Sequence, residues 1–207
     1  TARGRPLASQ RWLTRQINDP HVHEARKQGY RSRAAFKLIQ LDERFRLLKP
    51  GMRVLDLGAA PGGWTQVAAA RAGSSGAVVA VDILPMAPMA GVTVLELDFL
   101  AADAEQKVLD ALGGPVDIVL SDMAPSATGH KQTDHLRIMA LCETAADFAV
   151  RVLAPGGAFV CKVWQGGTES GLLAGLKRRF AQVRHAKPDA SRKESAETYL
   201  VATGFKG

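Results

Sequence analysis

The sequence predicts an α/β fold in which helices cover both faces of a seven-stranded, mostly parallel sheet. Beyond Pro50-Gly51, apolar runs of strand length alternate with helical stretches, which is the pattern of a parallel sheet wound with helices. Residues 78–81, Val-Val-Ala-Val, are apolar without alternation, as expected of a strand covered on both sides. The last two strands are joined without a helix, and so short a connection implies antiparallel pairing.

The expected elements follow one another from the N-terminus. Two helices that carry basic residues come before the sheet, at residues 8–28 and 32–46. We expect strands at residues 53–57, 77–82, 92–97, 116–121, 158–163, 181–187 and 198–203. The helices between them are expected at residues 63–72, 101–112, 133–153 and 169–180. A mostly parallel sheet with one antiparallel strand near its end is the arrangement of Rossmann-like, class I S-adenosylmethionine-dependent methyltransferases.

The length of 207 residues fits a single domain, which we divide into a basic N-terminal helical extension at 1–50 and a core at 51–207. Residues 1–50 hold 12 lysines and arginines against 4 acidic residues, and the rest holds 15 against 16. A one-sided basic region on a neutral core is typical of a protein that binds a phosphate backbone. A solvated surface that keeps the protein in solution has the same composition, and charge alone leaves both readings open.

The composition excludes several classes of protein. No apolar run is long enough to span a bilayer, and the chain does not open on an apolar signal segment. Cys142 and Cys161 make no disulfide framework, so a cytoplasmic protein is expected. The histidines lack the cysteines and carboxylates of a metal site, and no metal is expected. Nothing indicates a stable protein partner, so a monomer is expected.

The turn after the first expected strand has the features of a cofactor site. Gly58-Ala59-Ala60-Pro61-Gly62-Gly63 allows a tight strand-to-helix turn and close approach of a ligand at the carboxyl edge of the sheet. The spacing is not the G-x-G-x-x-G of dinucleotide sites, which favours S-adenosylmethionine over NAD. Asp82 ends the second strand, where it can accept the ribose hydroxyls of an adenosine, and Asp98 follows the third, near the expected adenine.

Lys162 is the unusual residue of the core. The fifth expected strand carries it within Phe-Val-Cys-Lys-Val-Trp, and a buried lysine is costly unless it has a partner or a task. Period-two alternation places Cys161 on the opposite face, where an inert thiol is expected. The fourth strand delivers Asp122-Met123-Ala124-Pro125 at the neighbouring edge.

With these motifs the chain resembles the FtsJ-type family of ribosomal RNA large subunit methyltransferase E over nearly its whole length. The matching segments are Ser-Arg-Ala-Ala-Phe-Lys-Leu at 32–38, Asp-Leu-Gly-Ala-Ala-Pro-Gly-Gly-Trp at 56–64, Ser-Asp-Met-Ala-Pro at 121–125, Leu-Ala-Pro-Gly-Gly at 153–157 and Lys-Pro-Asp-Ala-Ser-Arg at 187–192. The resemblance implies a catalytic tetrad of Lys37, Asp122, Lys162 and Glu197. It implies donor contacts from Gly62, Trp64, Asp82, Asp98 and Asp122.

The resemblance also implies a substrate, a uridine in the A loop of 23S ribosomal RNA within the large ribosomal subunit, methylated on its ribose 2′-hydroxyl. The donor is S-adenosyl-L-methionine and the product S-adenosylhomocysteine. Relatives that methylate transfer RNA or mitochondrial ribosomal RNA share the tetrad and remain alternatives. So do a non-catalytic RNA-binding or ribosome-assembly protein, and a nicotinamide-dependent oxidoreductase, which would explain neither Lys162 nor the basic extension.

We predict that Lys162 is the general base of this transfer and must be neutral when it acts. Lys37 and a bound sulfonium would lower its pKa, whereas Asp122 and Glu197 would raise it, and the sequence leaves the balance open. Asp122 is expected to orient Lys162, Lys37 to stabilise charge on the attacking oxygen, and Glu197 to hold a lysine in place. A structural ion-pair network is the alternative, and Lys162→Ala distinguishes the two by abolishing transfer while sparing donor binding.

Overall fold

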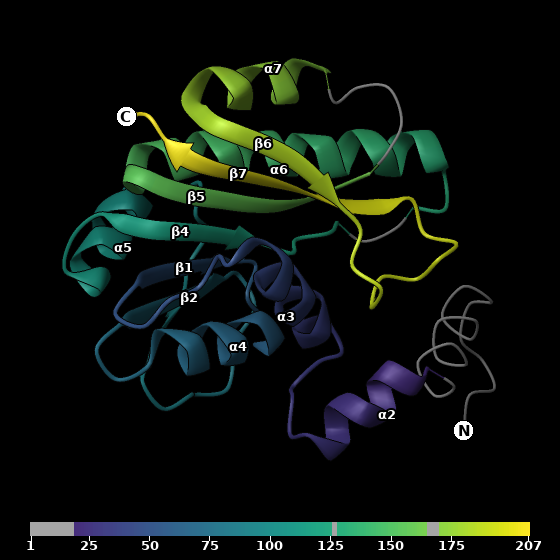
Figure 1. Cartoon of the computed structure of the whole chain (residues 1–207), viewed down its shortest axis with the longest axis horizontal. Helices are drawn as coiled ribbons and strands as arrows, with labels where there is room; N and C mark the ends of the chain where they lie inside the picture. Colours follow the sequence, from purple (N-terminus) through teal and green to yellow (C-terminus); the bar gives the residue numbers. More distant parts are fainter. Residues whose placement is uncertain (1–18, 126–127, 165–169) are drawn as a thin grey trace.

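A single seven-stranded sheet forms the centre of the computed structural model, which describes residues 19–125, 128–164 and 170–207 (Figure 1). The strands are β1 (Arg53–Leu57), β2 (Ala77–Asp82), β3 (Val92–Glu96), β4 (Val116–Ser121), β5 (Leu153–Trp164), β6 (Phe180–Ala186) and β7 (Glu197–Phe205). They lie in the order β3-β2-β1-β4-β5-β7-β6. Only β7 runs against its neighbours, β5 and β6, which confirms the predicted sheet with one antiparallel strand.

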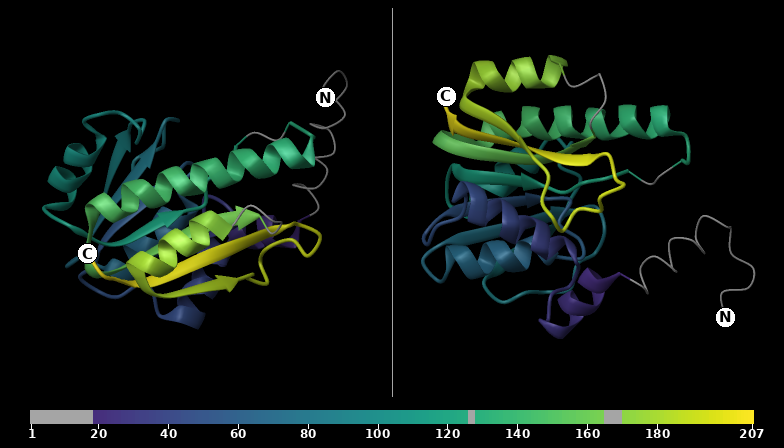
Figure 2. Two further views of the ribbon diagram at one scale, coloured as in Figure 1. Left: turned by 90° about the horizontal axis from the view of Figure 1, so that it is seen from above. Right: turned by 45° about the vertical axis from the view of Figure 1, so that its right-hand side comes forward.

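Helices cover both faces of the sheet. They are α2 (Pro20–Lys27), α3 (Ala34–Phe45), α4 (Gly63–Ala72), α5 (Ala104–Leu112), α6 (Lys131–Val152) and α7 (Ser170–Arg179). Helices α6 and α7 lie on one face of the sheet and α3 and α4 on the other (Figures 1 and 2). One apolar core joins the sheet to α5, α6 and α7, and a second joins its other face to α3 and α4. Within the described ranges, no helix combines the length and the apolar character that a bilayer span needs.

Successive side chains of β5 point to opposite faces of the sheet, so Cys161 and Lys162 lie on different faces. Cys161 and Val163 are buried in the core beneath α6, whereas Val160 belongs to the core on the α3 side. Because side chains alternate along a strand, Lys162 shares the face of Val160. The predicted placement of the Cys161 thiol, away from Lys162, is confirmed.

The carboxylate of Asp19 connects helix α2 to the rest of the protein. Asp19 caps α2 by accepting a hydrogen bond from the backbone N–H of His21, at 3.0 Å. The same side chain pairs with Arg33, at the start of α3, and with Arg192, 3.2 Å away in the β6–β7 loop. Three segments distant in the sequence therefore meet beside the carboxyl edge of the sheet.

Several predicted boundaries move in the structure. Residues 8–18 of the first predicted helix lie outside the described residues, as does Glu169, and α2 begins only at Pro20. Helix α5 begins at Ala104 rather than 101, because Ala101 and Ala104 donate to Asp98 and Ala101 in two successive turns. Strand β5 begins at Leu153, with a register shift against β4, although Pro-Gly-Gly reads as a turn in the sequence.

Candidate active site

Four charged side chains from four segments meet at the carboxyl edge of the sheet. Ser121 of β4 pairs with Cys161 of β5, so the next residues, Asp122 and Lys162, lie side by side. Strand β7 runs in the opposite direction and therefore begins where β5 ends, which pairs Glu197 with Trp164. Helix α3 contributes the fourth group, the buried side chain of Lys37.

The distances make one connected ion-pair cluster. Lys162 Nζ lies 3.0 Å from Asp122 Oδ1 and 3.6 Å from Glu197 Oε2. It also donates to the backbone carbonyl of Asp122, at 2.9 Å. Lys37 Nζ lies 2.7 Å from Glu197 Oε1 and 3.9 Å from Asp122 Oδ1. The structure thus brings together all four residues of the tetrad that the resemblance implied.

The electrostatics of the cluster give the direction of the Lys162 pKa shift for the unliganded protein. Burial lowers the pKa of Lys162, but the negative charges of Asp122 and Glu197 outweigh it, and the pKa stands above its ordinary value. Burial opposes the charge of Glu197 as well, yet Lys162 and Lys37 bring the pKa of Glu197 down to about 2. In the unliganded protein, both lysines are therefore paired with the charged carboxylate of Glu197.

Tyr199 belongs to the cluster, although the sequence analysis did not single it out. Its hydroxyl donates to Asp122 Oδ1 at 2.5 Å and lies 3.3 Å from Glu197 Oε1. Burial raises its pKa well above the usual value, and the charges of Asp122 and Glu197 add to that effect. One signal could have found it, because residues two apart on a strand share a face and Glu197 had been identified.

The glycine-rich turn lies next to this cluster. Gly58, at φ +70°, faces Met123, which follows Asp122 directly, and a Cβ on Gly58 would lie 2.1 Å from Met123 Cγ. Gly62 precedes α4 at φ +110°, and a Cβ there would meet Arg31 and Met86 at 3.1 Å. Only glycine fits either position without strain, because both the backbone and the neighbouring side chains exclude a larger residue.

Asp82 and Asp98 stand at successive strand ends, as predicted, and both also organise their own turns. Asp82 accepts from the N–H of Ala60 in the glycine-rich turn, at 2.9 Å, and from that of Leu84, at 2.8 Å. Asp98 accepts from the N–H of Leu100 at 2.9 Å. Asp82 therefore couples the end of β2 to the glycine-rich turn.

Trp64, which the resemblance implied as a donor contact, has its side chain in the core rather than at the open edge. The indole is 3% exposed, and its N–H donates to the carbonyl of Ala34 at 2.8 Å. Its ring lies 5.6 Å from that of Tyr199. The side chain joins α4 to α3 and packs against Tyr199, so the predicted donor contact of this residue can come only from its backbone.

Arg31 is a second residue that sequence reasoning missed. Its guanidinium donates to the carbonyls of Ala87 and Pro88, both at 2.7 Å, and to that of Pro61 at 3.4 Å. Its backbone N–H donates to Gln66 Oε1 at 2.6 Å. Arg31 therefore fastens the segment before α3 to both loops beside Asp82. In the sequence, Arg31 is one of several arginines in a basic region, so its position alone did not distinguish it.

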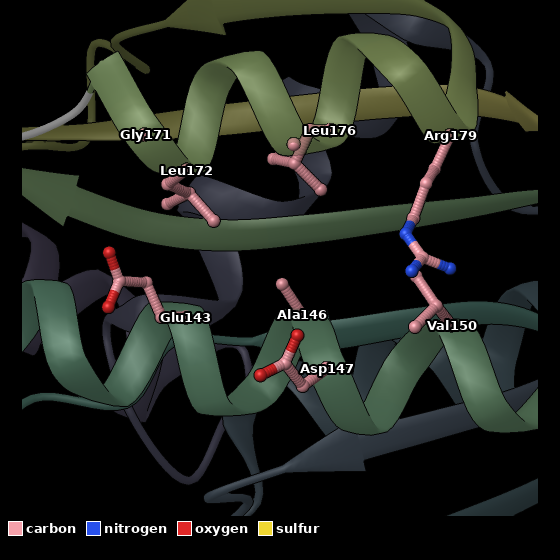
Figure 3. Close-up of a pocket in the computed structure, with 9 residues that line it drawn as sticks. Glu143, Ala146, Asp147, Val150, Gly171, Leu172, Leu176 and Arg179 are labelled. Atoms are coloured by element: carbon pink, nitrogen blue, oxygen red, sulfur yellow. The ribbon is translucent and has the colours of Figure 1, made fainter.

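Two other features stand apart from this site. A crevice of about 250 Å³ separates α6 from α7, with Glu143 and Asp147 on one side and Leu176 on the other (Figure 3). It lies on the α6 face of the sheet, opposite the face that carries Lys162. Across the part of the chain that the structure describes, no three histidine, cysteine or carboxylate side chains are grouped as a metal site requires.

Comparison with known proteins agrees with this geometry. The chain matches the model of the FtsJ-like methyltransferase family over residues 30–205. A ribosomal RNA large subunit methyltransferase E from Paramagnetospirillum magneticum is 62% identical over 212 residues, which cover 100% of this chain and 87% of that protein. The protein of the same name from Maricaulis maris is 62% identical over 207 residues, with 100% and 74% covered.

A solved structure is similar as well. A crystal structure assigned as a ribosomal RNA methyltransferase from Plasmodium falciparum matches with a TM-score of 0.74 and 31% identity, over 86% of this chain and 100% of that one. The resemblance predicted from the sequence motifs is confirmed. The family match over most of the chain and the full-length relatives lead to one conclusion: this protein is an enzyme of the FtsJ-like methyltransferase family.

Proposed function

We propose that this enzyme transfers a methyl group from S-adenosyl-L-methionine to the ribose 2′-hydroxyl of a uridine in the A loop of 23S ribosomal RNA, within the large ribosomal subunit. One observation supports the proposal most directly. The buried amine of Lys162 lies 3.0 Å from Asp122, and Met123, the residue after Asp122, faces Gly58 of the glycine-rich turn. The names of the full-length relatives support the ribosomal RNA substrate. We expect it to act in the cytoplasm as a monomer, without a stable protein partner.

The residues at the carboxyl edge suit the proposed donor. Three carboxylates lie along one edge of the sheet, beside the glycine-rich turn. Asp82 is the last residue of β2, Asp98 follows β3, and Asp122 follows β4. An adenosine offers ribose hydroxyls and an amino group as hydrogen-bond donors, and the methionine part offers an ammonium and a sulfonium. Carboxylates accept from all of the former and attract both cations. Gly62, free of a side chain, and the backbone of Trp64 complete the proposed donor site.

When bound, S-adenosyl-L-methionine supplies a methyl group that is already activated for transfer. The protein then has two tasks, to align the attacking hydroxyl and to take its proton. Lys162 Nζ accepts that proton. Asp122 orients the amine of Lys162 through both its carboxylate and its backbone carbonyl. Lys37 stabilises the developing charge on the oxygen, and Glu197 holds both lysines.

The raised pKa of Lys162 adds one requirement to this mechanism. In the unliganded protein the amine carries its proton, because Asp122 and Glu197 favour the charged form. A neutral amine is needed to accept a proton, so Lys162 would have to release its own proton to solvent before the transfer. A positive charge near the amine lowers its pKa, which makes donor binding the step that prepares the base.

The test is methyl transfer to isolated large subunits, with the modified nucleotide mapped in the RNA. Lys162→Met and Lys162→Ala are expected to reduce the rate at least a thousandfold, and donor affinity should change less than about threefold. Lys107→Met is the matched control, since Lys107 pairs with Asp103 on the surface of α5. Transfer RNA and protein-free ribosomal RNA serve as competing substrates. Robust transfer by the Lys162 variants, or modification of another nucleotide, would refute the proposal.

A further inference from the structure

Tyr199 occupies a position that the tetrad alone does not explain. It is 0% exposed and lies on β7 directly opposite Lys162 of β5. Its hydroxyl donates to Oδ1 of Asp122, the same oxygen that lies 3.0 Å from Lys162 Nζ. One carboxylate oxygen thus serves the phenol and the amine together.

We propose that Tyr199 is a positioning residue, whose hydroxyl weakens the hold of Asp122 on Lys162 and so keeps the amine available as a base. This inference rests on the proposed function of the site. A carboxylate oxygen that already accepts a short hydrogen bond has part of its negative charge neutralised, and it attracts a second donor less. The proton on the phenol stays in place at any working pH, because Tyr199 is buried between two carboxylates.

The ring of Tyr199 is buried and contacts two side chains, which hold its hydroxyl in position. The ring of Trp64 lies 5.6 Å away, and Lys37 Nζ lies 5.8 Å from its centre. A phenylalanine retains these contacts, since both are made by the ring. Removal of the hydroxyl therefore changes the hydrogen bond to Asp122 and the longer one to Glu197, at 3.3 Å, and leaves the packing in place.

The direction of the effect follows from the charged groups around Lys162. Asp122 after β4 and Glu197 on β7 favour its charged form, while Lys37 on α3 opposes it. Asp56 on β1 lies within electrostatic reach of Asp122 as well. Without the hydroxyl of Tyr199, Asp122 attracts Lys162 more strongly, and the amine loses its proton at a higher pH.

The experiment compares the wild type with Tyr199→Phe and with Tyr30→Phe, which removes the hydroxyl of the only other tyrosine in the sequence. Single-turnover methyl transfer is measured from pH 6 to 10. The titration of the Lys162 ammonium is followed over the same range by ¹⁵N NMR with S-adenosyl-L-methionine bound, since the pKa of the unliganded amine lies above its ordinary value, and the signal is assigned with Lys162→Met. In Tyr199→Phe we expect both midpoints to rise by about one pH unit, which is about a tenfold slower reaction below the midpoint. Tyr30→Phe should leave both unchanged, and donor affinity should be equal in all three proteins.

A second variant tests whether the two pH midpoints can also be shifted downward. Because the chain has two tyrosines, growth on 3-fluorotyrosine in the Tyr30→Phe background labels Tyr199 alone. The fluorinated phenol is a stronger donor, so both midpoints should fall. An equal loss of rate at every pH, or an unmoved Lys162 titration in both variants, would overturn the inference. The NMR titration needs no RNA, so failure of the proposed function would appear separately, as a wild type that does not methylate ribosomal RNA.

Discussion

The charge of Glu197 contributes to stability as well as to the site. Its pKa falls from 4.5 in a model compound to about 2 in the folded protein, because Lys162 and Lys37 favour the charged form. A lowered folded-state pKa means that the stabilisation is complete above pH 4.5 and is lost as the pH falls toward 2. A shift of this size corresponds to roughly 3 kcal/mol of unfolding free energy.

We therefore predict that Glu197→Gln is less stable than the wild type at pH 7 by about 2–3 kcal/mol. The difference should shrink steadily as the pH falls from 4.5 to 2. Urea unfolding at a series of pH values measures it. Glu143→Gln, on the exposed face of α6, is the control and should follow the wild type at every pH. A difference between Glu197→Gln and wild type that is the same at pH 7 and pH 2.5 would contradict this account.

Asp56 shows a net pKa shift opposite to that of Glu197, although burial raises the pKa of both carboxylates. It lies within β1, and burial raises its pKa to about 7, although the hydroxyl of Thr65 donates to it at 2.6 Å. The charged groups that act on the pKa of Asp56 are the carboxylates of Asp122 and Asp82, whereas Lys162 and Lys37 act on that of Glu197. The two residues differ in their partners rather than in their depth, which is why Glu197 is charged at neutral pH while Asp56 is poised between its two forms.

At the scale of elements, Arg31 holds together the loops that follow β1 and β2. Its donors already engage three backbone carbonyls, those of Pro61, Ala87 and Pro88. An arginine occupied in this way has less to offer an RNA phosphate, in spite of its place in a basic region. We infer that its contribution is to the donor site.

Arg31→Ala is accordingly expected to weaken S-adenosylhomocysteine binding about tenfold, since charge-assisted hydrogen bonds are worth about 1.5–3 kcal/mol each and exposure reduces that value. The salt dependence of RNA binding should stay as in the wild type. Arg26→Ala, an exposed arginine at the end of α2, is expected to show the reverse pattern. Calorimetry for the donor product and filter binding for the RNA measure the two effects. Normal donor affinity in Arg31→Ala would remove the role assigned to this residue.

The sequence predicted the elements and the strand-end residues because both follow from short-range rules. Lys162 stood out through its apolar neighbours, and Asp82 and Asp122 through their places after buried strands. The partners of Tyr199 and Arg31 were beyond such rules, since each is fixed by the register between segments far apart in the sequence. Lys37 and Glu197 were found only through resemblance to a family.

Over the whole molecule, the excess positive charge is concentrated near the N-terminus, a distribution that is typical of proteins that bind RNA. The sequence carries a net charge of +7, and four of its arginines, Arg3, Arg5, Arg11 and Arg15, precede the first acidic residue. Each phosphate contact that a protein makes releases counterions, so RNA binding should weaken steeply as salt increases.

Replacement of these four arginines by glutamine should reduce the slope of log affinity against log salt by about 3. Affinity for large subunits is measured between 50 and 300 mM salt, with donor affinity as the control for folding. Replacement of Lys177, Arg178 and Arg179, at the end of α7, by glutamine gives a comparable loss of charge elsewhere and should have little effect on the slope. An equal effect of both variants would mean that net charge alone, rather than its N-terminal position, governs binding.

The position of β7 between β5 and β6 has a consequence for how the protein is made. Synthesis produces β6 before β7, yet β6 reaches the sheet only through β7. The backbone of β5 therefore keeps an unpaired edge until β7 has left the ribosome, and such edges invite association between nascent polypeptides. Insertion of β7 closes that edge and at the same moment brings Glu197 and Tyr199 to the ion-pair cluster, so completion of the cluster and protection from aggregation are acquired in a single folding event.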